Sequence, residues 1–389
     1  MKSQIKTVVL MLITSVLSHG QEFSKIEMDE KYTIYKESFA TDNNTTLVLN
    51  LESTGVKIIG SPDDKVHIEY TMEFNNYRKK RMKEAIDRLK ISGKKEGNKI
   101  TYTAKSKNMF HRYDRHYYFE DLLIGRLAKK DSMRFEKPKV VRKSLDSVVE
   151  EIKQSDFLHR KRMLRAINRE PRPVKRKKNT KLIISKMVIM IPSHIHVRAT
   201  AENSSMYFDD DFQNRLTLNA RNSKLKFKSV GNPLNILDVD NGNFWAQEIT
   251  DGSYSFANSR SVTIAKLSNA EINSEFTKVQ VGEIGKNVKL VDFNSEYFLY
   301  NWAKDFEHFE LTSEYSKVHL FSPKLDYHFI AFGNNTKSFT GAHQVNMSAT
   351  KKNEKEKMIE RNPKGNNHFS GEIYFDIMNG IIYSYLDEL

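Results

Sequence analysis

The chain has 389 residues, a formal net charge of +14 and no cysteine. Disulfide scaffolds and thiolate metal sites are therefore excluded, and so is lipid attachment to a processed cysteine. Aromatic residues make up 11% of the chain, which is more than a disordered chain usually carries and enough for a packed core. The stability of the protein must therefore come from packing and strand pairing.

The first twenty residues have the pattern of a secretory signal peptide. Lys2 and Lys6 flank the start of an apolar run of 11 residues, Thr7–Leu17, and small residues lead to a cleavage site after Gly20. This run is too short to span a bilayer, and no later stretch approaches the roughly 20 apolar residues that a membrane helix needs. We therefore expect an exported bacterial protein in the periplasm, on the outer surface or in the medium.

Residues 21–72 are predicted to form strands. Thr46–Leu51 alternates apolar and polar residues, Glu52-Ser-Thr-Gly reads as a corner before a second strand, and Ser61–Tyr70 reads as a turn and a third strand. Such alternation is typical of strands with one buried face.

Residues 73–180 are predicted to be a basic, partly helical insertion. Between Glu73 and Lys181 there are 34 Lys and Arg against 14 Asp and Glu, a net charge of +20, so the rest of the chain carries +14 − 20 = −6. A mildly acidic scaffold thus contains one strongly basic segment.

Within this insertion the apolar spacing predicts a short helix over Arg78–Ile91 and a strand from Ile100. A second helical stripe starts at Leu145, with Ser144 as its N-cap, and continues to Ile167. Pro171–Lys178 is expected to be an extended linker.

The insertion also contains the candidate ligand-binding residues. Aromatic rings alternate with Arg and His from Phe110 to Phe119, and a basic run covers 160–178. Rings and cations in this mixture can stack on sugars and pair with anions. The alternative is that the aromatic rings pack the insertion against the rest of the protein and that the basic run is simply solvated. The candidate positions are Arg112, Tyr113, Arg115, His116, Tyr117, Tyr118, Arg160, Arg162, Lys175 and Arg176.

From residue 181 to residue 389 a short phrase recurs: Asn or Ser, a small polar residue, then alternating apolar and polar residues. Its first seven copies begin 19, 19, 17, 15, 21 and 18 residues apart, and weaker copies begin at Asn334 and Asn379. The first seven copies begin at Asn203, Asn222, Asn241, Asn258, Asn273, Asn294 and Thr312.

Repeats of this length cannot bury a hydrophobic face alone and must stack on their neighbours. We therefore predict a mainly β fold, a single-stranded β-solenoid whose polar phrases form the corners and whose C-terminal end is capped. The alternative is a β-sandwich, in which the same strands pair antiparallel.

The run LVLNLESTGVKIIGSPDDKVHIEY, residues 47–70, the strand ending at Pro192 and the repeats to residue 340 resemble the putative-adhesin family of exported bacterial β-solenoids. The resemblance implies the fold and a surface role, and it supplies no catalytic residues. The basic insertion is not part of the family pattern, and Asn and Ser stand where the family often has Gly.

No cofactor or metal site is expected. His194 and His196 share a strand face, a spacing that could bind a metal, but no third ligand is apparent and solvated histidines are the preferred interpretation. Asp209–Asp211 lacks the spaced oxygen ligands of a calcium loop, so a solvated turn is preferred. No nucleophile elbow, phosphate loop or zinc-protease motif is present.

We therefore expect a non-catalytic β-solenoid of the cell envelope or surface with an adhesin-like binding or structural role. Two alternatives remain: a binder of anionic glycan or envelope polymer that acts through the basic insertion, and a polysaccharide-acting enzyme on a β-solenoid. The expected partners are an envelope polymer, a glycan or a surface protein, and not nucleic acid. The sequence does not specify the oligomeric state.

Overall fold

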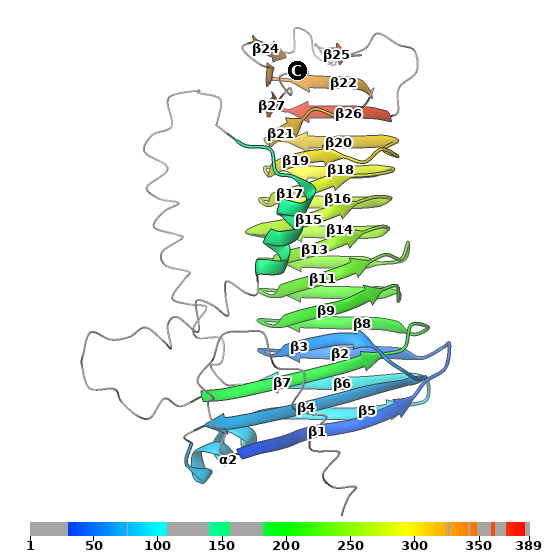
Figure 1. The fold of residues 1–389 in the computed structure, drawn as a ribbon, viewed down its shortest axis with the longest axis vertical. Helices are drawn as coiled ribbons and strands as arrows, with labels where there is room; N and C mark the ends of the chain where they lie inside the picture. Colours follow the sequence, from blue (N-terminus) through cyan, green and yellow to red (C-terminus); the bar gives the residue numbers. More distant parts are fainter. Residues whose placement is uncertain are drawn as a thin grey trace, which may run out of the picture.

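The computed structural model describes residues 30–75, 77–106, 140–155, 182–323, 325, 327–340, 343–347, 359–361 and 371–385. These residues are mainly β-strands, and they form one elongated stack (Figure 1). Among them there is no helix with both the length and the hydrophobicity that crossing a bilayer requires.

The strands form two sheets along the stack, with 14 strands in sheet A and 13 in sheet B. From the N-terminal end, sheet A consists of β1 (Glu30–Ala40), β4 (Lys65–Asn75), β7 (Leu182–Ile191), β3 (Gly55–Gly60), β9 (Ser205–Phe212), β11 (Lys224–Val230), β13 (Asn243–Ile249), β15 (Ser261–Leu267), β17 (Lys278–Ile284), β19 (Glu296–Trp302), β21 (Lys317–Phe321), β27 (Ile381–Tyr385), β23 (Thr336–Thr340) and β24 (His343–Met347). Sheet B consists of β5 (Leu89–Glu96), β6 (Lys99–Ser106), β2 (Thr46–Glu52), β8 (His196–Glu202), β10 (Leu216–Arg221), β12 (Ile236–Asp240), β14 (Gly252–Ala257), β16 (Ala270–Glu275), β18 (Val288–Phe293), β20 (His308–Glu314), β26 (Gly371–Met378), β22 (Tyr327–Asn334) and β25 (Ile359–Arg361).

Successive turns of the chain pair in parallel. We call one strand of sheet B, the turn after it and the next strand of sheet A a rung. Leu218 of β10 pairs with Leu237 of β12 in sheet B, and Phe227 of β11 pairs with Ala246 of β13 in sheet A, both in parallel register. A β-sandwich would pair such strands antiparallel. The predicted β-solenoid is therefore confirmed, and the β-sandwich alternative is wrong.

Each rung passes from sheet B to sheet A through a turn that we call the first corner. Its central residue has a positive φ, and in seven rungs this residue is an asparagine with φ between 49° and 56°. Asparagine suits this position because its short side chain tolerates the left-handed region and can bond locally. The seven residues are Asn203, Asn222, Asn241, Asn258, Asn294, Asn335 and Asn379.

In most rungs a serine or threonine follows the corner residue, with Gly242 and Gly380 as exceptions, and its hydroxyl can tie the rung to the one before it. Ser223 Oγ donates to the carbonyl of Arg221 at 2.8 Å and accepts the backbone N–H of Ser204 from the preceding rung at 3.1 Å. Ser295 Oγ likewise accepts the N–H of Thr277 at 3.0 Å. The buried backbone N–H groups of the corner are thereby satisfied inside the stack.

Alternate side chains of both sheets point inward and stack from rung to rung. The rings of Phe208 and Phe227 lie 4.2 Å apart between centroids at an interplanar angle of 12°. Phe244 and Phe256, from facing sheets, lie 4.9 Å apart. Equivalent positions thus form continuous apolar columns, which no single rung could bury by itself.

Antiparallel strands close the N-terminal end of the stack. β7 pairs antiparallel with β4, and β4 with β1. On the other side β6 extends sheet B in parallel with β2, and β5 pairs antiparallel with β6. β5 and β6 lie within the range 73–180, so this part of that range belongs to sheet B.

The helix predicted over Arg78–Ile91 is wrong at its C-terminal end. The helix α2 covers only Lys79–Asp87, and its residue Met82 is buried. Leu89 and Ile91 instead belong to β5, because the hairpin with β6 gives them strand partners. The strand predicted from Ile100 is confirmed as β6.

The C-terminal end has a non-sequential order. The last strands of the described chain, β26 and β27, lie between the rung of β20 and β21 and the rung of β22 and β23 (Figure 1). β26 pairs in parallel with β20 on one side and with β22 on the other. β25 and β24 then pair antiparallel with β22 and β23 at the end of the stack.

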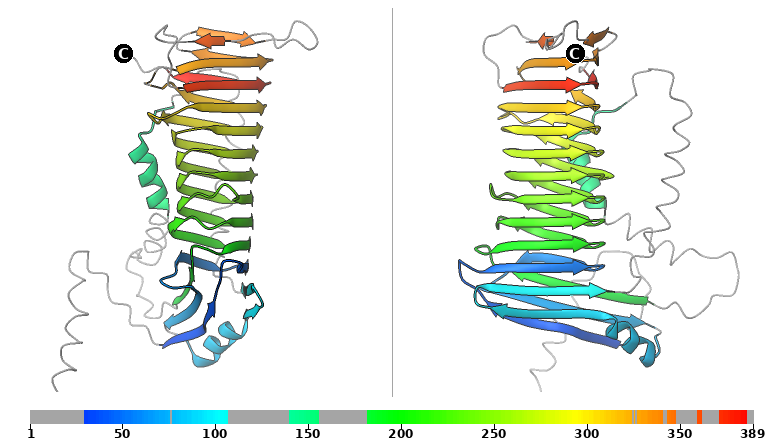
Figure 2. Two further views of the ribbon diagram at one scale, coloured as in Figure 1. Left: turned by 90° about the vertical axis from the view of Figure 1, so that its right-hand side faces the viewer. Right: turned by 180° about the vertical axis from the view of Figure 1, so that it is seen from behind.

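Residues 140–155, which we call the clasp, pack against the outer face of sheet A (Figure 2). Residues 145–155 are helical, and Ser144 Oγ accepts the N–H of Ser147 at 3.2 Å, as the predicted cap requires. Val148 and Ile152 are fully buried in a second hydrophobic cluster outside the interior of the stack. The continuation of this helix toward Ile167 lies outside the described residues.

The outer face of sheet A is shaped to receive the clasp. An added Cβ at Gly282 would lie 2.6 Å from the carbonyl oxygen of Ala265 and 3.2 Å from Cβ of Val148, so this position admits no side chain. Nε and Nη2 of Arg142 donate to the carbonyls of Tyr300 at 2.9 Å and Ser322 at 3.3 Å.

Candidate functional site

The ten candidate ligand-binding residues of the basic insertion lie outside the described residues. They are Arg112, Tyr113, Arg115, His116, Tyr117, Tyr118, Arg160, Arg162, Lys175 and Arg176. Their role remains a prediction from the sequence.

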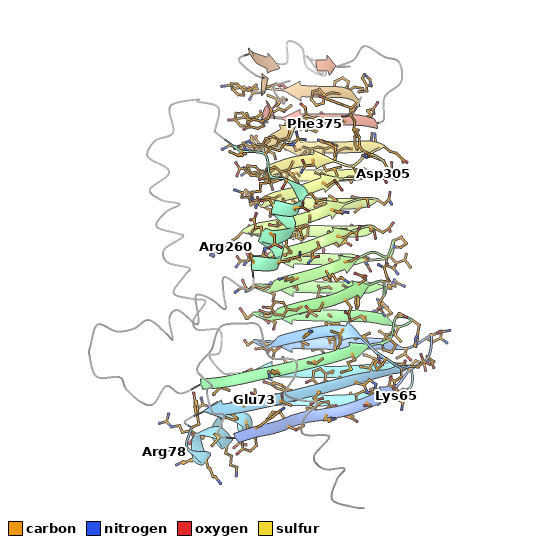
Figure 3. All side chains as sticks on the ribbon, viewed as in Figure 1. Lys65, Glu73, Arg78, Arg260, Asp305 and Phe375 are labelled. Carbon is orange, nitrogen blue, oxygen red and sulfur yellow. The ribbon has the colours of Figure 1, made fainter. Side chains whose placement is uncertain are left out.

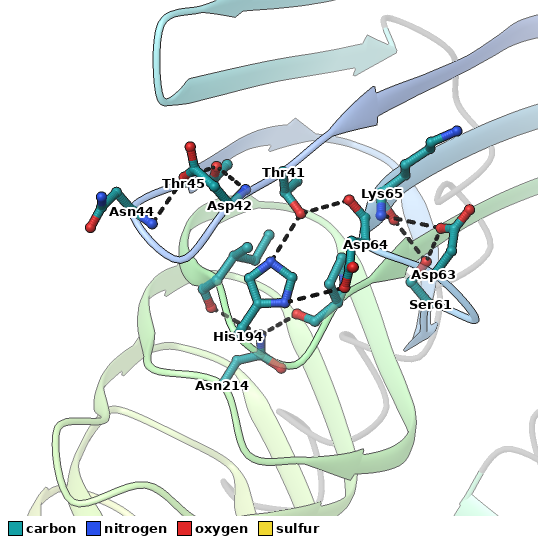
Figure 4. Close-up of polar contacts among 12 residues, drawn as sticks. Thr41, Asp42, Asn44, Thr45, Ser61, Asp63, Asp64, Lys65, His194 and Asn214 are labelled. Carbon is teal, nitrogen blue, oxygen red and sulfur yellow. Dashed lines mark hydrogen bonds and ion pairs between the residues drawn. The ribbon is translucent and has the colours of Figure 1, made fainter.

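The expectation that His194 and His196 share a strand face is wrong: His194 lies in the turn before β8 and His196 is the first residue of that strand, and the two side chains bond to separate partners. His194 Nε2 lies 3.1 Å from Oγ1 of Thr41, and its Nδ1 lies 3.9 Å from Oδ1 of Asp64 (Figure 4). His196 Nε2 lies 3.1 Å from Oγ1 of Thr217, and burial lowers the pKa of this imidazole, with the charges of nearby arginines lowering it further. Across the described part of the chain, no three His, Asp or Glu side chains gather as metal ligands would.

The run Asp209–Asp211 is not a turn, contrary to the sequence prediction. It lies in β9, where the pairing with β11 shifts register, because the strand continues to the buried Phe212. Asp209 Oδ2 lies 2.7 Å from Nζ of Lys57, and Asp211 Oδ1 lies 3.2 Å from Nζ of Lys228. These carboxylates form surface ion pairs with neighbouring strands.

One trio resembles a hydrolytic arrangement. His67 Nδ1 lies 2.7 Å from Oγ of Ser38, and its Nε2 lies 2.7 Å from Oδ1 of Asp63. These side chains lie exposed across β1 and the start of β4, whereas nucleophilic catalysis relies on oxyanion donors held in a water-excluded site. We interpret the trio as a surface hydrogen-bond network.

A shallow groove of about 470 Å³ lies along the first corner and crosses four consecutive rungs. Arg260 lies on this edge of the stack, and Asp305 lies on the opposite edge (Figure 3). The groove is lined by Ser259, Arg260, Phe276, Thr277, Lys278, Asn294, Ser295, Glu296, Tyr315 and Lys317.

Three exposed aromatic rings follow this corner. Phe276, Phe293 and Tyr315 have exposed fractions of 47%, 39% and 51%. The centroid of Phe293 lies 5.6 Å from that of Phe276 and 5.8 Å from that of Tyr315, both in edge-to-face contact. The three rings form one apolar strip, which we call the aromatic strip, on the outside of the stack.

Two rings of the strip stand in the strained corner position. Phe276 has a φ of 49° and Tyr315 a φ of 61°, close to the 49° to 56° of the asparagines at this corner in other rungs. A residue with a Cβ and no short amide costs on the order of 1 kcal/mol or more in this region. Strain of this kind is a reason to look for function at this corner.

Glu296 is tied into the groove wall by a hydrogen bond with His319 and an ion pair with Lys278. Its Oε1 lies 3.2 Å from Nε2 of the buried His319, and its Oε2 lies 3.9 Å from Nζ of Lys278. The hydrogen bond from His319 lowers the pKa of Glu296, and the charge of Lys278 lowers it further. Lys278 Nζ also sits 4.6 Å from the ring centroid of Phe298.

A buried polar network supports the corner from inside. Ser316 and Ser274 both donate to the carboxylate of Asp292, and Asp292 Oδ2 accepts the N–H of Ser295 at 3.3 Å. The hydroxyl of Tyr297 contacts Ser274. Burial raises the pKa of Tyr297 well above its usual value, with the charge of Asp292 contributing. This network fixes the backbone that carries Asn294 and Tyr315.

The predicted repeats did not reveal the aromatic strip, because two of them begin out of register with the corners. Asn273 and Thr312 lie within β16 and β20, and the corner residues are Phe276 and Tyr315. A signal was present: Thr277 and Ser316 follow these rings as Ser follows Asn in other rungs. With these corners the spacings from Asn258 become 18, 18 and 21 residues.

No family model matches the chain, and no curated protein matches its sequence. Among solved structures, the chain is similar to one described as a "putative cell adhesion protein from Clostridium sporogenes ATCC 15579". The two share 11% identity over 91% of this chain and 99% of the other, with a TM-score of 0.18. At these values the similarity transfers neither fold nor function, and the resemblance to the adhesin family remains a prediction.

Proposed function

We propose that this protein is an exported, non-catalytic β-solenoid that binds a polysaccharide chain along the first-corner groove, in an adhesin-like role at the cell surface or envelope. One observation carries the proposal: the aromatic strip stands exposed beside a polar groove, and two of its rings occupy strained backbone positions.

The chemistry of the strip suits sugars. A pyranose ring has an apolar face of C–H groups and an edge of hydroxyls, so it needs a flat apolar surface next to hydrogen-bonding groups. Phe276 and Tyr315 offer the apolar surface. Between them in the stack, Asn294 offers an exposed amide. A sugar can therefore stack its apolar face on one of these rings while its hydroxyl groups point toward the polar side chains of the groove.

The shape of the groove favours a polymer over a single sugar. It crosses four rungs, which at a strand spacing of about 4.8 Å corresponds to a length of about 14 Å between the first and last rung. The rungs are held by parallel ladders in both sheets, so the ligand-binding atoms keep fixed spacings. A preformed, rigid site lowers the entropy cost of binding an extended chain.

Binding without turnover is part of the proposal. Glycoside hydrolysis generally uses two carboxyl groups on either side of the bond that breaks. Of the described residues that line the groove, Glu296 alone is a carboxylate. Its pKa is lowered by His319, which is the wrong direction for a general acid. Incubation of the purified protein with the bound polysaccharide should release no reducing ends.

Export is the other part of the proposal, and it depends on residues 1–20. A fusion of these residues to a reporter enzyme that is active only outside the cytoplasm should give an exported, active reporter. Replacement of Leu10 by Arg within the apolar run should retain the reporter in the cell.

Binding to immobilised polysaccharides tests the function directly. Phe276→Asn and Tyr315→Asn should each reduce affinity by about tenfold, since each removes an apolar ring face on which a sugar stacks. Ile236→Ser is the matched control, because it removes an exposed apolar side chain, 49% exposed, far from the groove. Equal affinity of the two ring variants and the wild type would overturn the proposal.

A further inference from the structure

The groove repeats one pair of side chains at an interval of two rungs. Phe276 is followed two residues later by Lys278, and Tyr315 is followed two residues later by Lys317. In each pair the ring sits at the first corner with a positive φ and the lysine begins a strand of sheet A. We call the two pairs the ring–lysine subsites.

The rung between the two subsites presents different chemistry. Asn294 occupies the corner position, and Glu296 occupies the position of the lysines. Lys278, Glu296 and Lys317 are direct neighbours in the parallel register of sheet A. Along the groove the order is therefore cation, carboxylate, cation.

The lining as a whole attracts anions. Arg260, Lys278 and Lys317 oppose the single carboxylate of Glu296, so the charge of the described lining is +3 − 1 = +2. The charge of Glu296 is directed toward His319, whose side chain is 2% exposed, and toward Lys278. A ligand with acidic groups would meet the exposed lysines at the ends and the carboxylate in the middle.

We infer that the groove binds an anionic polysaccharide in which a carboxylate recurs on every second sugar. Each acidic sugar stacks on Phe276 or Tyr315 and directs its carboxylate to Lys278 or Lys317. The neutral sugar between them lies over Asn294 and Glu296, which accept its hydroxyl or amide donors. Two rungs span about 9.6 Å, close to the length of an extended disaccharide.

This inference rests on the proposed function, and the choice of ligands separates the two. Hyaluronan carries a carboxylate on alternate sugars, carboxyl-reduced hyaluronan has the same backbone without charge, polygalacturonate is acidic at every sugar, and dextran sulfate presents charge as sulfate. The full chain is titrated with each polymer at low and at physiological salt.

The expected order is hyaluronan first, with affinity at least about tenfold lower for the carboxyl-reduced form, because two cation contacts are lost. Binding should also weaken as salt rises. Equal affinity for the two forms would overturn the inference and leave the proposed function standing. Absence of binding to every polymer would overturn both.

Two variants test the spacing. Lys317→Met should weaken hyaluronan binding by up to about fivefold, since an exposed charge contact contributes at most about 1 kcal/mol. Glu296→Gln should raise the affinity for polygalacturonate relative to hyaluronan, because it removes repulsion of a carboxylate in the middle position. The control is Lys153→Met, an exposed lysine of the clasp, 54% exposed. If polygalacturonate or dextran sulfate binds the wild type as tightly as hyaluronan, the alternation is wrong.

Discussion

The side-chain amide of Asn241 donates to Oδ1 of Asn222, one rung away, at 2.6 Å. Both residues have a φ of 51°. The same side chain therefore does two things: it tolerates the left-handed corner and it bonds to the neighbouring corner. The next asparagine, Asn258, donates instead to Oδ1 of Asp240, the residue before the corner at Asn241, at 3.2 Å.

Replacement of Asn241 separates these two contributions. Asn241→Ala should lower the free energy of unfolding by about 1–2 kcal/mol, because alanine has no amide to offset the cost of the left-handed backbone conformation. Asn241→Gly should cost less, since glycine adopts the same φ freely and loses only the hydrogen bond. Urea denaturation followed by circular dichroism measures both. A glycine variant less stable than the alanine variant would contradict the role of the corner conformation.

The strained backbone at Phe276 predicts the relative stability of two variants. Phe276→Asn should be more stable than Phe276→Ala by about 1 kcal/mol, because both lose the contact with Phe293 but only alanine keeps the full left-handed penalty. Thermal unfolding of the two variants compares them directly. Equal melting temperatures would show that the corner position of Phe276 is not strained.

The clasp should come loose without unfolding the stack. Ile152→Ala should weaken its docking by about 2–5 kcal/mol, since a fully buried side chain is truncated. The matched control is Lys153→Ala, next in sequence and exposed. Limited proteolysis should cut the first variant near residues 140–155 while the β-sheet circular dichroism is unchanged. Equal protease resistance of the two variants would mean that the cluster around Val148 does not hold the clasp.

Alkaline pH should unfold the protein in step with tyrosine ionisation. Burial raises the pKa of Tyr385 to about 12, and it also raises the pKa of Tyr102 and Tyr254. A raised pKa means that the unfolded state releases its protons first, so this stabilisation is complete below about pH 10 and is lost as the pH rises toward and beyond the folded values.

Tyrosinate absorbance and circular dichroism, recorded together, test this expectation. Part of the 17 tyrosines should ionise near pH 10 with the strands intact, and the rest should ionise with loss of the β signal. Ionisation of all the tyrosines in one step near pH 10, with the β signal retained, would contradict the burial of these phenols.

Corners could be predicted from sequence because they are local. The phrase that begins at Asn203 or Asn222 contains both residues that the turn requires. The asparagine tolerates a positive φ, and the serine after it accepts a hydrogen bond from a buried backbone N–H group. The 3.6-residue period from Leu145 and its cap at Ser144 are local in the same sense. The β-solenoid and the start of the clasp helix were therefore predictable.

Features that depend on distant partners could not be predicted. The ring of Phe276 and its neighbours Phe293 and Tyr315 become a strip only when three rungs stack. Val148 packs against the outer face of sheet A at a place where Ala265 and Gly282 have little or no side chain, and this site exists only in the folded sheet. The position of β26 and β27 depends on which strand edges are still open when that part of the chain pairs.

That last position has a consequence for biosynthesis. Because β26 and β27 lie between the rung of β20 and β21 and the rung of β22 and β23, β22 and β23 can take their places in the stack only after Gly371–Tyr385 has been synthesised. A chain that stops before Gly371 would lack β26 and β27, so the edges of β20 and β21 would be open to pairing with another strand, including one from a neighbouring chain.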